Sequence, residues 1–274
     1  MAKYLIDDST LTSIAAAIRD KTGSSQGITP ESMATEITNM SSGDIKGPYI
    51  EETYDSNGNL IEARLVNNYT KVRYGLFTRA NYLQKVRIPD EITIIDSSAF
   101  SNCSKLVDIN IPSSLQRIND NAFNMCSLLA TINLPEGLTY IGATAFSYCY
   151  ELNFQNLPSS VNTIYSSAFS NCKKLAITKL PSSLKLIQSN AFSGCISLTT
   201  MTIPSSLKTL PDKVFNGCTN LTEVTFEGIP TNINSNLFYN CPNLITINVP
   251  WAEGAVANAP WGATNATINY NYTA

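Results

Sequence analysis

One spacing constrains the fold of this chain more than any other feature. Phenylalanine recurs every 23 residues from Phe100 to Phe238, and cysteine recurs at the same step from Cys103 to Cys241. A leucine follows each cysteine at the same distance, and no insertion or deletion breaks the count. A fixed period of this length is typical of stacked repeats, in which each coil packs only on its neighbours. The sequence therefore predicts a solenoid with one continuous core.

Within each coil the apolar residues follow a fixed order. The pattern is L-x-x-I-x-I-P-x-x-L-x-x-I-x-x-x-A-F-x-x-C, as in the segment from Leu106 to Cys126. Residues 107–111 alternate between polar and apolar side chains, which indicates a half-buried strand. Proline ends this strand in most coils, because it cannot donate to a strand ladder. We expect each Ala-Phe pair to turn the chain and to point its ring into the core.

Two neighbouring coils depart from this alternation. Phe154 and Ile177 occupy a strand position that is polar in the other coils, and a polar residue follows each of them. Either a local bulge reorients both strands, or the two apolar side chains lie exposed beside each other. The sequence leaves both alternatives open.

The first 66 residues are predicted to hold two small units. Residues 1–42 predict two short helices, the second of which begins with Thr29 as cap and Pro30 in its first turn. Two short helices bury little surface, so we expect this module to anchor the chain to another protein or to a copy of itself. Residues 43–66 predict a linker and a β-hairpin around Asn57-Gly58, which caps the first coil and covers its open edge.

The repeats are predicted over residues 60–250, and the last 24 residues differ from them. Trp251 and Trp261 are the two tryptophans of the chain, and a β-rich run follows from Ala266 to Tyr272. We expect residues 251–274 to form a C-terminal cap, in which the tryptophans cover the end of the core and a final strand follows.

Composition excludes several kinds of function. Charged residues make up 14% of the chain, the net charge is −3, and there is no histidine. No basic patch predicts nucleic-acid binding, and no apolar run is long enough to span a membrane. The lack of histidine removes histidine-based catalytic triads and histidine metal ligands. We therefore expect no enzyme activity, no cofactor and no metal, and we expect the seven cysteines to be buried free thiols.

The candidate ligand-binding residues come from two patterns. Polar columns on the outward side of the strands suit a binding surface, although they also fit an ordinary solvated sheet. Aromatic residues gather in the middle coils, where they suit sugar stacking or protein contact, although tyrosine also tolerates exposed strand positions. The candidates are Arg87, Asn110, Thr131, Asn133, Tyr140, Tyr148, Tyr150, Phe154, Asn156 and Lys179.

The L-x-x-I-x-I-P and A-F-x-x-C motifs resemble the BspA-type (Treponema-type) leucine-rich repeat. The resemblance covers residues 60–250 and recurs without a gap. It implies a mainly β fold, namely a curved, right-handed superhelix of 23-residue coils with a parallel β-sheet on its concave face. It also implies surface or secreted proteins of bacteria and protists that adhere and bind host proteins.

The two ends resemble a narrower group. The segments from Tyr4 to Met33, from Tyr49 to Asp55 and from Ala259 to Tyr272 are similar to segments of structural proteins from tailed phages of Gram-positive gut bacteria. This resemblance implies a tail or capsid component that assembles in the bacterial cytoplasm. It agrees with the N-terminal residues, which lack the apolar stretch of a secretory signal.

These observations predict a non-enzymatic binding protein of a phage virion. Residues 1–42 are expected to contact other virion proteins or to form a trimer, and the repeats are expected to adhere to a bacterial surface polysaccharide or protein. Two alternatives stay open. One is a bacterial surface or secreted adhesin that binds host matrix proteins, and the other is a structural decoration protein without a ligand.

Overall fold

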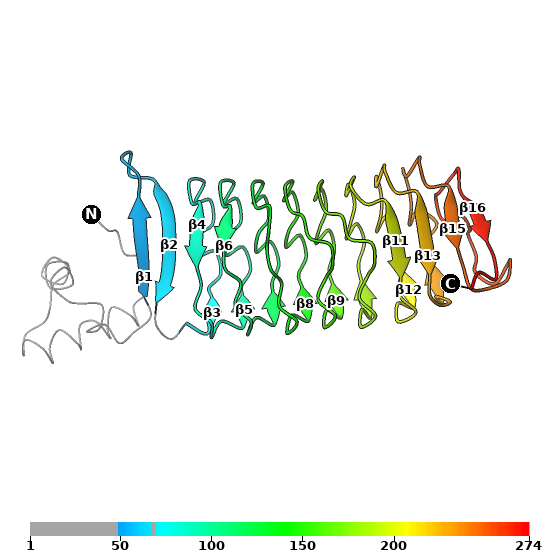
Figure 1. The fold of residues 1–274 in the computed structure, drawn as a ribbon, viewed down its shortest axis with the longest axis horizontal. Helices are drawn as coiled ribbons and strands as arrows, with labels where there is room; N and C mark the ends of the chain where they lie inside the picture. The colour runs from blue at the N-terminus through cyan, green and yellow to red at the C-terminus, as the bar shows by residue number, and fades with distance from the viewer. Residues whose placement is uncertain (1–48, 67–68, 274) are drawn as a thin grey trace, which may run out of the picture.

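The computed structural model describes residues 49–66 and 69–273, and it shows a parallel β-solenoid. The predicted helical module of residues 1–42 lies outside these ranges. Figure 1 shows the coils stacked side by side along one long axis, with the hairpin at one end and the C-terminal strand at the other. Within the described ranges, no helix is long and apolar enough to cross a membrane.

The predicted hairpin begins the described part. Strands β1 (Tyr49–Tyr54) and β2 (Leu60–Val66) pair antiparallel, with Tyr49 opposite Val66. The Asp55 carboxylate accepts hydrogen bonds from the backbone N–H groups of Asn57 and Asn59, both at 2.9 Å. Gly58 has a φ of 78°, a conformation that glycine adopts at little cost. Strand β2 then pairs parallel with the first coil, as the sequence predicted.

The coils form two rows of short parallel strands. The first row, which the sequence predicted, carries the L-x-x-I-x-I segments. Its strands are β2, β4 (Lys85–Arg87), β6 (Asp108–Ile109), β11 (Thr200–Ile203), β13 (Glu223–Phe226), β15 (Thr246–Asn248) and β16 (Thr267–Asn269).

The second row runs along another side of the body and is visible near the lower edge of Figure 1. Six of its strands form one continuous sheet, and the last two pair with each other. The sequence predicted a buried column here but not a strand, because only two residues per coil pair. The strands are β3 (Lys71–Val72), β5 (Ile94–Ile95), β7 (Arg117–Ile118), β8 (Tyr140–Ile141), β9 (Thr163–Ile164), β10 (Leu186–Ile187), β12 (Thr209–Leu210) and β14 (Asn232–Ile233).

The first row is interrupted between β6 and β11. Three successive coils carry no strand there, and the single bridge Lys179–Thr202 rejoins the row. Ile177 is fully buried, and the half-buried Phe154 ring meets the Phe169 ring edge-on at 6.0 Å between centroids. The backbone therefore turns both apolar side chains inward. Of the two alternatives above, local reorientation is correct and the exposed pair is wrong.

A column of stacked rings runs through the core. Successive phenylalanine rings lie 5.2–5.8 Å apart between centroids, with planes within 19° of parallel. The column begins one coil before the predicted start, at Phe77. No coil could bury its ring alone, so stacking is what removes these rings from water.

Two tryptophans close the far end of the core. Trp251 and Trp261 are both buried, and each ring contacts the Phe226 ring. Strand β16 pairs parallel with β15 and forms the last member of the first row. Both features agree with the predicted cap.

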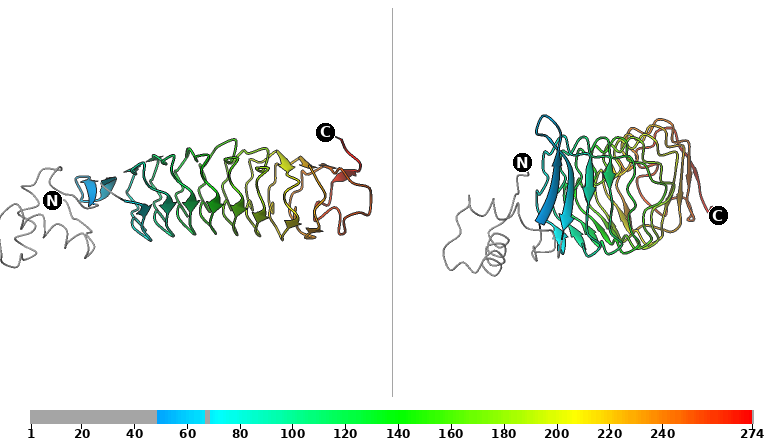
Figure 2. Two further views of the ribbon diagram at one scale, coloured as in Figure 1. Left: turned by 90° about the horizontal axis from the view of Figure 1, so that it is seen from below. Right: turned by 60° about the vertical axis from the view of Figure 1, so that its left-hand side comes forward.

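The stack follows a nearly straight line in Figure 1 and in the left view of Figure 2. The resemblance implied a curved body with a parallel sheet on its concave face, but the described coils form a nearly straight stack without a concave side (Figure 1 and Figure 2). We call the outward side of the first row the first-sheet face.

Candidate functional site

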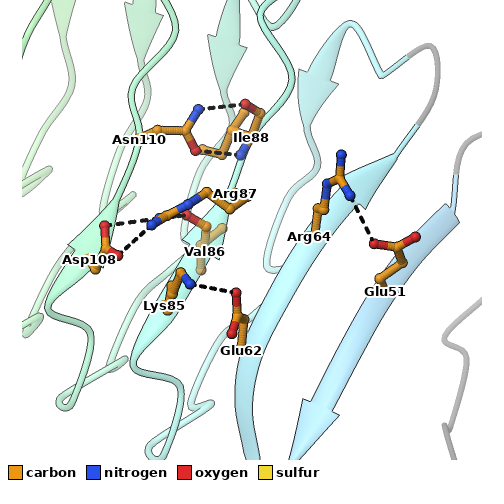
Figure 3. Close-up of polar contacts among 9 residues, drawn as sticks. All are labelled: Glu51, Glu62, Arg64, Lys85, Val86, Arg87, Ile88, Asp108 and Asn110. Atoms are coloured by element: carbon orange, nitrogen blue, oxygen red, sulfur yellow. Dashed lines mark hydrogen bonds and ion pairs between the residues drawn. The ribbon is translucent and has the colours of Figure 1, made fainter.

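The N-terminal part of the first-sheet face carries a ladder of ion pairs (Figure 3). Arg87 on β4 donates two hydrogen bonds to the Asp108 carboxylate on β6, one of them at 2.9 Å. Lys85 pairs with Glu62 at 3.0 Å on the other side of β4. The hydrogen bonds from Arg87 hold the pKa of Asp108 below its usual range. The predicted site residue Arg87 is thus engaged by a neighbouring coil.

Asn110 is also engaged within the body. Its side-chain amide donates to the Ile88 carbonyl and accepts from the Ile88 N–H, both at 2.7 Å (Figure 3). The side chain thereby continues the ladder where backbone pairing between β4 and β6 has ended. Its observed contacts are structural.

A groove lies over the interruption in the first row. It has a volume of about 340 Å³ and is open to solvent. Both Asn156 and Lys179, two of the predicted residues, line it. The full lining is Glu136, Asn156, Leu157, Ser159, Lys179, Leu180, Pro181, Ser182 and Glu227.

The charges of this groove differ in how they are held. Glu136 accepts hydrogen bonds from the N–H and the hydroxyl of Ser159, at 2.9 and 2.7 Å. Among the described residues, Lys179 and Glu227 have no side-chain hydrogen bond or ion pair. The groove therefore offers a free cation, a free carboxylate and the Asn156 amide to a polar ligand.

Three further predicted residues belong to the same face. Thr131 and Asn133 are exposed in the first of the interrupted coils. Phe154 is turned inward, so its ring is packed against the core rather than offered to a ligand. Phe154 was included among the candidate binding residues, and its inward ring corrects that choice.

The three predicted tyrosines lie elsewhere. Tyr140 belongs to β8 in the second row, where the Arg117 guanidinium covers its ring at 3.7 Å from the centroid. Tyr148 and Tyr150 lie on the turn after the phenylalanine, with rings 6.1 Å apart and perpendicular. The structure therefore divides the ten predicted residues among three places, and their binding role stays a prediction.

The turn itself holds residues that sequence reasoning missed. Tyr82, Val107, Met125 and Leu128 are exposed on the same edge as Tyr148 and Tyr150. A signal for one of these missed residues, Met125, was present in the sequence. The second position after each phenylalanine is Asn or Gly in most coils, but it is Met125 and Tyr148 in two adjacent ones.

The cysteines of the column are unreactive. All seven thiols are free and buried, and each donates to the carbonyl of the phenylalanine 26 residues earlier, at 3.0–3.2 Å. Burial raises the pKa of Cys103 to about 12 and that of Cys241 to about 11. Because the thiolate is the reactive form, these thiols are inert at neutral pH. Across the described residues, no group of three potential metal ligands gathers.

Solved structures of leucine-rich repeat proteins are similar to this chain. A leucine-rich repeat protein from Bacteroides ovatus ATCC 8483 is 25% identical, with a TM-score of 0.50 over 80% of this chain and 75% of its own. The T. pallidum leucine rich repeat protein is 28% identical, with a TM-score of 0.55 over 71% and 87%. A leucine rich cell surface protein from Faecalibacterium prausnitzii A2-165 is 28% identical, with a TM-score of 0.45 over 73% and 62%. No curated protein matches the chain.

The sequence also matches a family model. The model describes the BspA type leucine rich repeat region and matches residues 50–176 and 140–255. Together these two overlapping ranges span residues 50–255, which is well over half of the sequence. The chain therefore belongs to the BspA-type leucine-rich repeat family.

Proposed function

We propose that this protein is a non-enzymatic adhesion protein that binds a polysaccharide or protein on a bacterial cell surface. The observation that carries this proposal is the groove over the interrupted coils, with its unpaired Lys179 and Glu227. A polar ligand would pair these charges, and Asn156 would add a donor and an acceptor. Sugars and polypeptides both carry such groups.

The rigid body supports binding by repeated weak contacts. The stacked rings and inter-coil hydrogen bonds fix the groove relative to the rest of the first-sheet face. Several copies on one particle would convert a weak contact into firm attachment, because the later contacts form at a high effective concentration. This mechanism needs no chemistry from the inert thiols.

The particle we propose is a phage virion, with residues 1–42 as the anchor to other virion proteins. The support for this placement is the resemblance of residues 4–33 and 259–272 to phage structural proteins. Membership of the BspA-type family favours a second candidate, an adhesin displayed on a bacterial cell that binds host matrix proteins. A specific antibody would distinguish them, by locating the chain in purified phage particles or in the cell-envelope fraction of the strain that encodes it.

The binding proposal is tested with labelled full-length protein and intact Gram-positive gut bacteria. We expect the wild type to bind, and the variant K179A/E227A to bind at least tenfold more weakly. K185A is the matched control, because Lys185 is exposed beside β10 in the second row. If both variants bound the cells as tightly as the wild type does, the groove would not be the binding site. No binding to any strain would favour a decoration protein without a ligand.

A further inference from the structure

The turn after each phenylalanine forces one residue into a left-handed backbone conformation. The second residue after the ring has a φ between 58° and 72° in eight successive coils. This conformation is costly for most side chains and is tolerated best by glycine and asparagine. Five of the eight positions follow that preference, namely Asn102, Asn171, Gly194, Gly217 and Asn240.

Met125 and Tyr148 are exceptions in adjacent coils, each with a φ of 61°. The solenoid imposes the conformation on them, because their N–H groups donate to the Ser147 and Ser170 carbonyls of the next coil at 2.8 Å. Neither side chain enters the buried core in return, since Met125 is 42% exposed and Tyr148 is 38% exposed. Backbone strain that places no side chain in the core is more typical of functional positions than of structural ones.

Other exposed apolar side chains continue this surface over neighbouring coils. We call the set the edge patch, and all its members are 36–48% exposed. The next two coils present mainly lysine, glycine, serine, threonine and asparagine on the same edge, with Ile196 as the exposed large apolar residue there. The members of the edge patch are Tyr82, Val107, Met125, Leu128, Tyr148 and Tyr150.

Cations surround the edge patch. The Lys105 ammonium lies 4.5 Å from the centre of the Tyr82 ring, and the Lys173 ammonium lies 4.7 Å from that of Tyr150. Arg79 occupies the equivalent strained turn position at the N-terminal side, and Lys174 pairs with Glu151. Asp55 at the hairpin turn is a second carboxylate, close enough for Lys105 to act on it, and Asp108 beside Val107 is already paired with Arg87. With that neutral pair set aside, four cations against two carboxylates make this edge locally positive, although the whole chain has a net charge of −3.

From these observations we infer that the edge patch docks an acidic polypeptide segment that carries aromatic or other apolar side chains. The apolar side chains would cover Met125, Leu128 and Val107, and the acidic groups would meet the lysines at the rim. A polysaccharide suits this surface less, because the aliphatic members offer no hydrogen bonds to sugar hydroxyls. This surface is separate from the groove of the first-sheet face and does not depend on the function proposed for that groove.

The test uses the full chain and an immobilised random copolymer of glutamate and tyrosine as the probe. We expect the wild type to bind this copolymer at least tenfold more tightly than polyglutamate, and not to bind a lysine–tyrosine copolymer. The variant M125N/Y148N should lose at least tenfold in affinity. Its melting temperature should equal or exceed that of the wild type, because asparagine suits the left-handed position. I229N is the control, since Ile229 is equally apolar and exposed but lies off this edge.

Several results would overturn the inference. If polyglutamate bound as tightly as the glutamate–tyrosine copolymer, charge alone would explain the binding. If dextran sulfate bound equally tightly, the ligand would be an acidic polysaccharide rather than a polypeptide. If M125N/Y148N melted at a lower temperature than the wild type, Met125 and Tyr148 would stabilise the fold, and a binding role would not be needed to explain them. No copolymer binding by the wild type would also count against it. The groove variant K179A/E227A should keep copolymer binding, so the two proposals fail separately.

Discussion

The core column and the first-sheet face are built by the same 23-residue step, yet they behave differently. In the column, every ring stacks on the next and every thiol meets a phenylalanine carbonyl, from one end of the body to the other. On the first-sheet face, an ion-pair ladder gives way to a groove without strands and then to a Thr- and Asn-rich sheet. The comparison shows that coils can stack only if their buried residues are alike, whereas their solvent-facing residues can differ from coil to coil.

The largest expected effect tests the uniformity of the column by raising the pH. Folding raises the pKa of the buried thiols above the ordinary value of 9.0. The unfolded chain therefore loses thiol protons first, and stability should fall as the pH rises from about 9 towards the folded values. At pH 10 each thiol should remove about 1.4 kcal/mol of unfolding free energy, and the seven thiols together about 10 kcal/mol.

This alkaline loss is measured by urea denaturation between pH 8 and pH 10.5. The variant C126A/C172A/C218A should show a shallower decline with pH than the wild type. Unchanged slopes would mean that tyrosines and lysines, rather than the thiol column, control alkaline unfolding.

The second prediction compares the middle of the ring column with its end. Phe169 stacks on two rings at 5.3 Å and also meets Phe154, whereas among the described residues Phe77 stacks on Phe100 alone. F169A should reduce the unfolding free energy by about 3–5 kcal/mol, as expected for a cavity in a tight core. F77A should cost clearly less, because the end of the column can relax. Equal losses in urea denaturation would contradict the view that a ring held between two neighbours contributes more than a ring at the end of the column.

The third prediction concerns one position of the first-sheet face in two coils. Asn110 makes two hydrogen bonds to the Ile88 backbone, whereas Asn133, one coil later, is exposed. N110A should cost about 1–3 kcal/mol, since it leaves backbone groups without partners. N133A should stay within about 0.5 kcal/mol of the wild type. Thermal melts of both variants would test whether the face really changes role between these coils.

The smallest expected effect is that of the exposed ion pair between Arg87 and Asp108. A double-mutant cycle with R87A and D108A should give a coupling below about 1 kcal/mol, because solvent screens the pair. The coupling should weaken in high salt. It should also decline as the pH falls below about 4 and be lost only below the lowered pKa of Asp108, since the carboxylate contributes only while it is ionised. If salt did not weaken the coupling, the ion pair would be shielded from solvent, as interactions in the core are.

Much of this division could be predicted from the sequence, and the failures lie on the surface. The ring column, the buried thiols, the hairpin at Asn57-Gly58 and the tryptophan cap all follow from apolar spacing and turn chemistry. The second row of strands was missed, because two paired residues per coil give no alternating pattern. The direction of Phe154 was left open, because polarity alone does not say whether a strand bends.

The sequence by itself determined the coil length, the core and the family, because a fixed 23-residue step buries its apolar columns in only one stacking register. Only the tertiary structure decided which surface residues are free. It used Arg87 and Asn110 within the body, turned Phe154 inward, and left Lys179 and Glu227 unpaired over the interrupted coils. It also brought Met125 and Tyr148 together on one strained edge. Such contacts join residues one or more coils apart, so they depend on backbone direction and side-chain reach, which spacing does not encode.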